Sequence, residues 1–157
     1  MSFNKAYTLI EVIFVIVIIS ILSSFVLINY NDIIFSANEL KARDKIDSIR
    51  SAIALQRTKN ILLNINAPNY YPLSLDNSKN YMQIGEKLFF YNESNESNLL
   101  DYPTLSSNRI GGWLKVDENR YSLRLSNDIS IIFTYNPITG SFDCDHDKSE
   151  CRMIFNE

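Results

Sequence analysis

A long run without charge near the N-terminus constrains the fold most strongly. The 20 residues 12–31 contain no Asp, Glu, Lys or Arg, and the run opens with Val-Ile-Phe-Val-Ile-Val-Ile-Ile. Twenty helical residues rise about 30 Å, the thickness of the hydrocarbon core of a bilayer. The sequence therefore predicts a helix that crosses a membrane once.

A single carboxylate, Glu11, stands directly before this run. An ionised side chain at the edge of a membrane segment is costly and needs a partner of opposite charge. No Lys or Arg occurs in the helical turn that follows Glu11, and Lys5 lies six residues earlier, too far along a helix. We therefore expect the partner of Glu11 to come from outside its own helix.

The residues around Glu11 resemble a known signal. A short leader ends in Lys5-Ala6, Tyr-Thr-Leu-Ile-Glu follows at residues 7–11, and the apolar run comes next. This order resembles the class III signal of type IV pilins and type II secretion pseudopilins, although Ala6 stands where Gly is usual and Tyr7 where Phe is usual. The resemblance implies that a prepilin peptidase cuts between Ala6 and Tyr7 and methylates the new N-terminus of Tyr7. It also implies that Glu11 pairs with the N-terminal amine of a neighbouring subunit.

Two other kinds of N-terminal signal fit these residues less well. A secretory signal peptide has a basic start, an apolar core of about 7–15 residues and a small-residue cleavage site after it. The run here is longer, and Ser20, Ser23 and Ser24 do not form an Ala-x-Ala site. The stronger alternative is an uncleaved signal anchor that carries a periplasmic binding or adaptor protein, but an anchor does not require Glu11.

The helix is expected to continue beyond the membrane run. Neither Gly nor Pro occurs in residues 7–67, and apolar residues recur at helical spacing through Ile46, Ile49 and Ile53. We predict one helix of roughly fifty residues that ends at residues 63–67, where Asn64, Asn66 and Pro68 break the pattern. The predicted segments are a leader (1–6), a transmembrane and assembly helix (7–30), its periplasmic half (31–66) and a periplasmic globular head (67–157).

The sequence of the head predicts an antiparallel sheet. Apolar and polar residues alternate in short runs joined by polar turns, which predicts strands at 113–116, 121–125, 129–135 and 141–144 and a last one at 152–155. A short strand or helical turn is expected at 87–91. The apolar face of this sheet needs cover, which Ile46, Ile49 and Ile53 can supply. The fold class is therefore α+β and pilin-like, with Trp113 in the core.

The two cysteines, Cys144 and Cys151, lie seven residues apart. This spacing, in a region beyond a membrane span, predicts a disulfide in an oxidising compartment. The positive-inside rule points the other way, because Lys5 is alone before the span while Lys41, Arg43 and Lys45 follow it. The disulfide and the resemblance outweigh that rule and imply a single-pass inner-membrane protein with a periplasmic head.

Two further sites are conceivable in the head. Asp143, Asp145, Asp147 and Glu150 lie in or beside the cysteine loop, and carboxylates at such spacing can converge on calcium. The alternative is a solvated acidic loop, since Lys148 stands where an EF-hand needs Gly. Glu-Ser-Asn-Glu-Ser at residues 93–97 resembles the acceptor of bacterial N-glycosylation, with Asn95 as the modified residue.

Catalytic motifs are missing from the sequence. The single His146 has no paired nucleophile, and neither a Gly-rich phosphate loop nor a metal triad occurs. We therefore expect no enzyme activity. A weaker hypothesis is DNA binding by four basic residues near Trp113 and Tyr121 in the sequence: Arg109, Lys115, Arg120 and Arg124. The net charge of −3 does not support this hypothesis.

We interpret the chain as a minor pseudopilin in a type II secretion or natural-transformation machine. Its partners would be the prepilin peptidase, other pseudopilins and an inner-membrane assembly platform. The signal is shared by secretion and DNA-uptake systems, so the sequence does not separate them, and it does not separate a major from a minor subunit.

Overall fold

A computed structural model describes residues 8–90 and 98–155, apart from the side chains of residues 25–32. The chain forms two compact units, residues 1–36 and 37–157. The first contains the N-terminal part of helix α1. The second contains the rest of α1, called the stem here (residues 37–63), and the head (residues 67–157).

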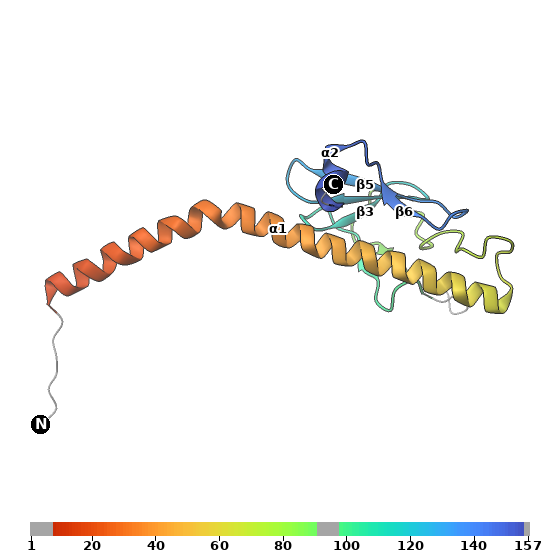
Figure 1. Ribbon diagram of the computed structural model, residues 1–157, viewed down its shortest axis with the longest axis horizontal. Coiled ribbons are helices and arrows are strands. Elements are labelled where there is room, and N and C mark those ends of the chain that lie inside the picture. Colours follow the sequence, from red (N-terminus) through yellow and green to blue (C-terminus); the bar gives the residue numbers. More distant parts are fainter. Residues whose placement is uncertain (1–7, 91–97, 156–157) are drawn as a thin grey trace, which may run out of the picture. The chain divides into compact units, whose positions relative to one another are not determined.

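Helix α1 runs over Leu9–Leu63, which is 55 residues (Figure 1). Its start is a capping box, because the Thr8 hydroxyl accepts a hydrogen bond from the Glu11 backbone N–H (3.4 Å) and the Glu11 carboxylate accepts one from the Thr8 N–H (3.2 Å). Its end coincides with Asn64 and Asn66, which both adopt positive φ angles, 53° and 58°. Asn tolerates this left-handed conformation better than most residues. The predicted long helix and its C-terminal end are confirmed.

The first turns of α1 expose a run of large apolar side chains. The large apolar residues between positions 9 and 22 are each 40–80% exposed. Among the residues whose side chains are described, no helix contains a stretch long and apolar enough to cross a membrane. The predicted span over residues 7–30 stays a prediction.

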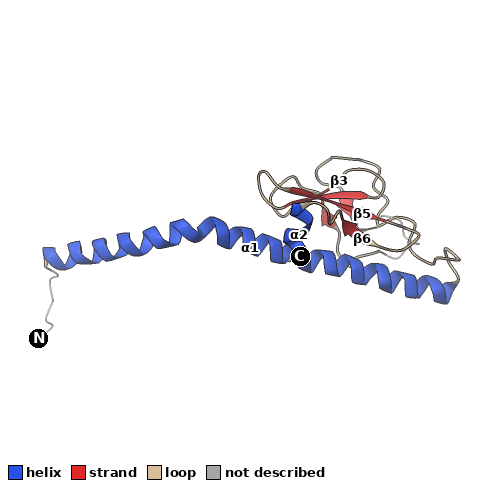
Figure 2. Ribbon diagram, turned by 45° about the horizontal axis from the view of Figure 1, so that its top comes forward, coloured by secondary structure: helices blue, strands red, loops and turns tan. Residues whose placement is uncertain are grey.

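The head contains a four-stranded antiparallel sheet in the order β3-β4-β5-β6 (Figure 2). Its strands are β3 (Trp113–Lys115), β4 (Arg120–Arg124), β5 (Ser130–Tyr135) and β6 (Phe142–Cys144). A second small sheet pairs β1 (Lys87–Leu88) with β2 (Thr104–Leu105). The meander predicted from the alternating pattern is confirmed, and the α+β, pilin-like fold class with it.

The core lies between the stem and one face of the sheet. Ile131, Phe133 and Tyr135 on β5 are buried, while the residues between them are exposed. Ile46, Ile49 and Ile53 on the stem are buried as well, and the stem runs alongside the sheet in both views (Figures 1 and 2). Five rings fill the centre with centroids 4.7–6.1 Å apart: Phe89, Trp113, Tyr121, Phe133 and Phe142. Trp113 is a core residue, as predicted.

The prediction of a final strand at 152–155 is wrong. These residues belong to helix α2 (Ser149–Phe155). Its buried residues, Cys151 and Ile154, are three positions apart, which places them on one face of a helix and on opposite faces of a strand. Lys148 O accepts hydrogen bonds from the N–H groups of Cys151 (3.1 Å) and Arg152 (3.3 Å), and these bonds close the first turn.

Candidate functional site

The N-terminal signal is partly within the described structure. The predicted cleavage site, Ala6 and Tyr7, lies outside the described residues. Glu11 is described, and its carboxylate accepts hydrogen bonds from the N–H (3.2 Å) and the hydroxyl (3.3 Å) of Thr8. These donors are neutral, and none of the five ion pairs found among the described residues includes Glu11. The pairing of Glu11 with a neighbouring amine stays a prediction.

The structure joins Cys144 and Cys151 in a disulfide. Cys144 is the last residue of β6 and Cys151 lies in the first turn of α2, and both are buried. The bond therefore fastens α2 to the edge of the sheet.

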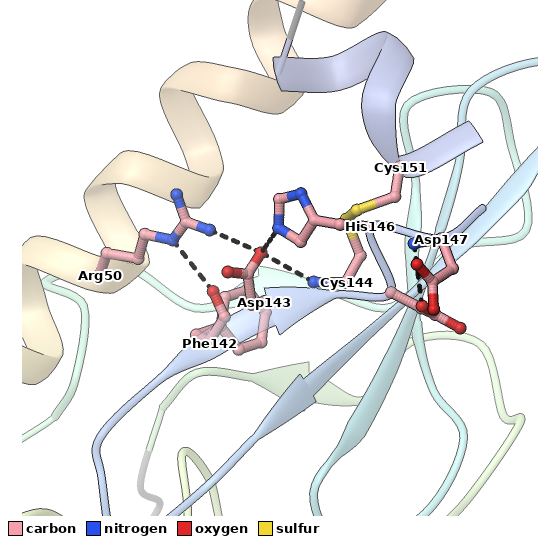
Figure 3. The surroundings of a disulfide bond; sticks show 8 residues. Arg50, Phe142, Asp143, Cys144, His146, Asp147 and Cys151 are labelled. Atoms are coloured by element: carbon pink, nitrogen blue, oxygen red, sulfur yellow. Dashed lines mark hydrogen bonds and ion pairs between the residues drawn. A yellow bond between two sulfur atoms is a disulfide. The ribbon is translucent and has the colours of Figure 1, made fainter. Parts of the chain in front are cut away.

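Asp143 is the centre of a polar network beside this disulfide (Figure 3). Its Oδ1 accepts hydrogen bonds from Arg50 Nη2 (2.9 Å) and the Cys144 N–H (2.9 Å), and His146 Nε2 lies 3.2 Å away. Arg50 also donates from Nε to the Phe142 carbonyl (3.0 Å). The Arg50 guanidinium lies over the Phe155 ring (4.9 Å), and the His146 ring stacks on the same ring (5.5 Å). The network ties the stem to the disulfide loop.

The four carboxylates predicted to hold calcium do not converge. Asp143 is bound to Arg50, Asp145 accepts a hydrogen bond from the Asp147 N–H (3.1 Å), and Glu150 accepts one from the Ser149 hydroxyl (3.2 Å). Among the described residues, the one group with closely spaced potential ligand atoms is Asp143, His146 and Cys151, all within 4.8 Å of one another. Calcium binding stays a prediction, as does modification of Asn95, which lies outside the described residues.

A buried ion pair lies on the other side of the core. Lys115 is only 3% exposed, and its Nζ donates to Asp76 Oδ1 (2.6 Å) and to the Ser78 carbonyl (2.7 Å). Asp76 Oδ2 accepts hydrogen bonds from the Tyr121 hydroxyl (3.0 Å) and the Phe89 N–H (3.2 Å). Each charge is therefore paired and hydrogen-bonded, which is the condition for keeping charges inside a protein.

DNA binding by the four basic residues near Trp113 stays a prediction, although the structure engages three of them in other contacts. Lys115 is enclosed in the core, Arg120 forms an ion pair with Asp117, and Arg124 donates to the Asn108 side chain (3.0 Å). Partial desolvation pushes the pKa of Asp117 upward. Hydrogen bonds from the Arg120 side chain and from backbone N–H groups outweigh this effect and hold the pKa below its usual value.

A half-buried cation lies on the stem. Burial lowers the pKa of the Lys45 ammonium, because the charged form loses hydration.

Comparison with known families identifies the N-terminal segment. Residues 1–27 match the family model described as the prokaryotic N-terminal methylation motif. The chain therefore carries the prepilin-type signal of type IV pilins and pseudopilins, on a pilin-like fold. Comparisons with curated proteins and with solved structures gave no significant match. Proteins with this signal are structural subunits that a prepilin peptidase processes and that assemble with other pilin-like subunits.

Proposed function

We propose that this chain is a minor pseudopilin, a structural subunit of a periplasm-spanning pseudopilus in a type II secretion or DNA-uptake machine. The observation that carries the proposal is the methylation motif at residues 1–27. Two structural features support it. The helix exposes its large apolar side chains at residues 9–22, within the motif, and the head forms a buried core of its own with the stem.

The exposed half of the helix supports an assembly role. Leu9, Ile10 and Phe14 are 65–80% exposed and belong to a continuous apolar surface, which is unfavourable in water. Burial gains about 25 cal/mol for each Å² of apolar surface removed from water. We infer that residues 7–30 lie in the inner membrane before assembly and among neighbouring helices afterwards.

The disulfide supports a periplasmic head. Cys144 and Cys151 are bonded, and disulfides persist in oxidising compartments such as the bacterial periplasm. The partners of the chain are then the prepilin peptidase, other pseudopilins and the assembly platform of the inner membrane. An uncleaved, signal-anchored binding or adaptor protein is the alternative function.

Processing separates these two functions. Mass spectrometry of the protein from native membranes is expected to find an N-terminus at N-methylated Tyr7. The same intact mass will show whether Asn95 carries a glycan. A chain that keeps residues 1–6 would contradict the pseudopilin function and favour the anchored alternative.

Replacing Glu11 tests assembly separately from processing. Glu11→Ala is expected to be cut normally but to lose most of its incorporation into filaments, because the neighbouring amine loses its partner. Glu11→Gln is the sharper variant, since an amide oxygen can still cap the helix at this position but carries no charge. The measurement is the fraction of chain recovered in filaments relative to membranes.

Asp47→Ala, which removes an exposed carboxylate from the same helix, provides the matched control. It is expected to assemble like the wild type. Normal filament entry by Glu11→Gln would show that the charge of Glu11 is not used for assembly.

A further inference from the structure

We propose that Cys144 and Cys151, when reduced, bind zinc together with His146 and Asp143. The Asp143, His146 and Cys151 ligand atoms lie within 4.8 Å of one another, and Cys144 contributes the sulfur bonded to Cys151 (Figure 3). Two thiolates, one imidazole and one carboxylate are a ligand set that Zn²⁺ accepts in tetrahedral geometry. The loop between the cysteines is thus a metal site when they are reduced and a covalent cross-link when they are oxidised.

The redox state decides whether enough ligands are present. In the disulfide, both sulfurs are bonded to each other and neither is a thiolate, which leaves only Asp143 and His146. Two ligands do not make the four-coordinate site that protein-bound zinc requires. Reduction supplies the two missing ligands at once.

The spacing fits the metal after small side-chain rotations. With Zn–S bonds of about 2.3 Å and Zn–N bonds of about 2.0 Å, tetrahedral ligand atoms lie roughly 3.3–3.8 Å apart. The present separations reach at most 4.8 Å for the three-residue group. The Asp143, His146 and Cys151 ligand atoms therefore need to approach one another by about 1 Å. The two sulfurs, which are bonded to each other in the disulfide, separate on reduction, while β6 and α2 hold the backbones of the two cysteines.

Neighbouring groups already orient the two ligands that do not change with redox state. Arg50 and the Cys144 N–H both donate to Oδ1 of Asp143, which fixes the orientation of this carboxylate beside His146 Nε2. The Phe155 ring stacks on the His146 imidazole and fixes its plane. Such contacts outside the ligand set raise metal affinity by holding the ligands in place.

A cavity gives solutes access to the site. Asp143, Cys144 and Cys151 line a cavity of about 510 Å³ that is open to solvent. Asp145, Lys148 and Glu150 form part of the same lining, and their side chains are polar and hydrated. The cavity is therefore the route by which a metal ion and a small reductant would approach the two cysteines.

The chemistry balances with a trialkylphosphine as the reductant. One disulfide, one phosphine and one water give two thiols and one phosphine oxide. Binding of Zn²⁺ then releases one proton from each thiol, and the metal keeps its oxidation state. Because oxidation and metal binding use the same two sulfurs, bound zinc is expected to slow disulfide formation.

The test uses the full chain in detergent, with Co²⁺ as the spectroscopic probe and Zn²⁺ as the competitor. After phosphine reduction, one equivalent of Co²⁺ is expected to give thiolate-to-cobalt charge-transfer bands and the visible bands of tetrahedral cobalt. Zn²⁺ should abolish them. The oxidised chain is expected to show neither. Fluorescence of the buried Trp113 reports whether the reduced head stays folded.

Variants identify the ligands. His146→Ala and Asp143→Asn are each expected to weaken Zn²⁺ binding at least tenfold, whereas Asp147→Asn, in the same loop, leaves it unchanged. Equal affinity of the oxidised and reduced chains, or of His146→Ala and Asp147→Asn, would overturn the proposal. Calcium, which prefers oxygen ligands, is not expected to replace Co²⁺.

Discussion

Replacing Lys115 with alanine is expected to lower the free energy of unfolding of the head by about 3–5 kcal/mol. The substitution removes the ammonium that pairs with Asp76 Oδ1 at 2.6 Å and leaves the carboxylate buried. Asp76 keeps the hydrogen bonds from the Tyr121 hydroxyl and the Phe89 N–H, but these neutral donors do not replace a full positive charge. The large cost arises because an uncompensated charge remains in the core.

Urea denaturation followed by the fluorescence of Trp113 measures this change. Arg120→Ala is the matched control, because Arg120 also pairs with an aspartate, Asp117, but at the surface of the same sheet. An exposed pair contributes about 0–1 kcal/mol. If both variants lose similar stability, burial of the Asp76–Lys115 pair does not determine the cost of removing its cation.

Phe142→Ala is expected to lower the free energy of unfolding by about 3–5 kcal/mol. Phe142 is 1% exposed, and its ring stacks on Phe133 with centroids 5.3 Å apart. It also meets the rings of Phe89, Trp113 and Tyr121 within 6.1 Å. Truncation opens a cavity where four aromatic side chains meet, and rigid rings cannot collapse into it easily.

The same denaturation experiment distinguishes a packing effect from loss of aromatic area in general. Phe142→Leu is expected to cost less than Phe142→Ala, because it restores part of the lost volume. Tyr102 is 83% exposed, so Tyr102→Ala should change stability by less than about 0.5 kcal/mol. A Phe142→Ala variant as stable as Tyr102→Ala would show that this position is not central to the core.

The parts of the fold that could be predicted depend on local patterns. The long helix follows from the spacing of Ile46, Ile49 and Ile53, and strand β5 from the alternation that buries Ile131 and Phe133. Each pattern repeats within a few residues, so one chain is enough to see it. The N-terminal signal is equally local, which is why Glu11 could be recognised without a structure.

The interactions that the sequence did not reveal join distant segments. Asp76 and Lys115 are 39 residues apart, and Arg50 and Asp143 are 93 apart. No periodic signal links such positions, and a lysine between two strand-forming residues reads as a surface residue until the fold encloses it. Helix α2 was missed for another reason, since a run as short as residues 152–155 fits either period.

The contacts between stem and head also bear on the order in which the chain folds. Arg50 reaches the Phe142 carbonyl across 92 residues, and Arg43 reaches the Met153 carbonyl across 110. Contacts between residues so far apart in sequence form slowly, because the chain must close a long loop and lose conformational entropy before the contacts stabilise it. The stem also precedes the head in the chain, so it is synthesised before the segments that cover it. During that interval Ile46, Ile49 and Ile53, which the head buries in the folded chain, face solvent, and we expect this apolar stripe to be a binding site for a holding chaperone.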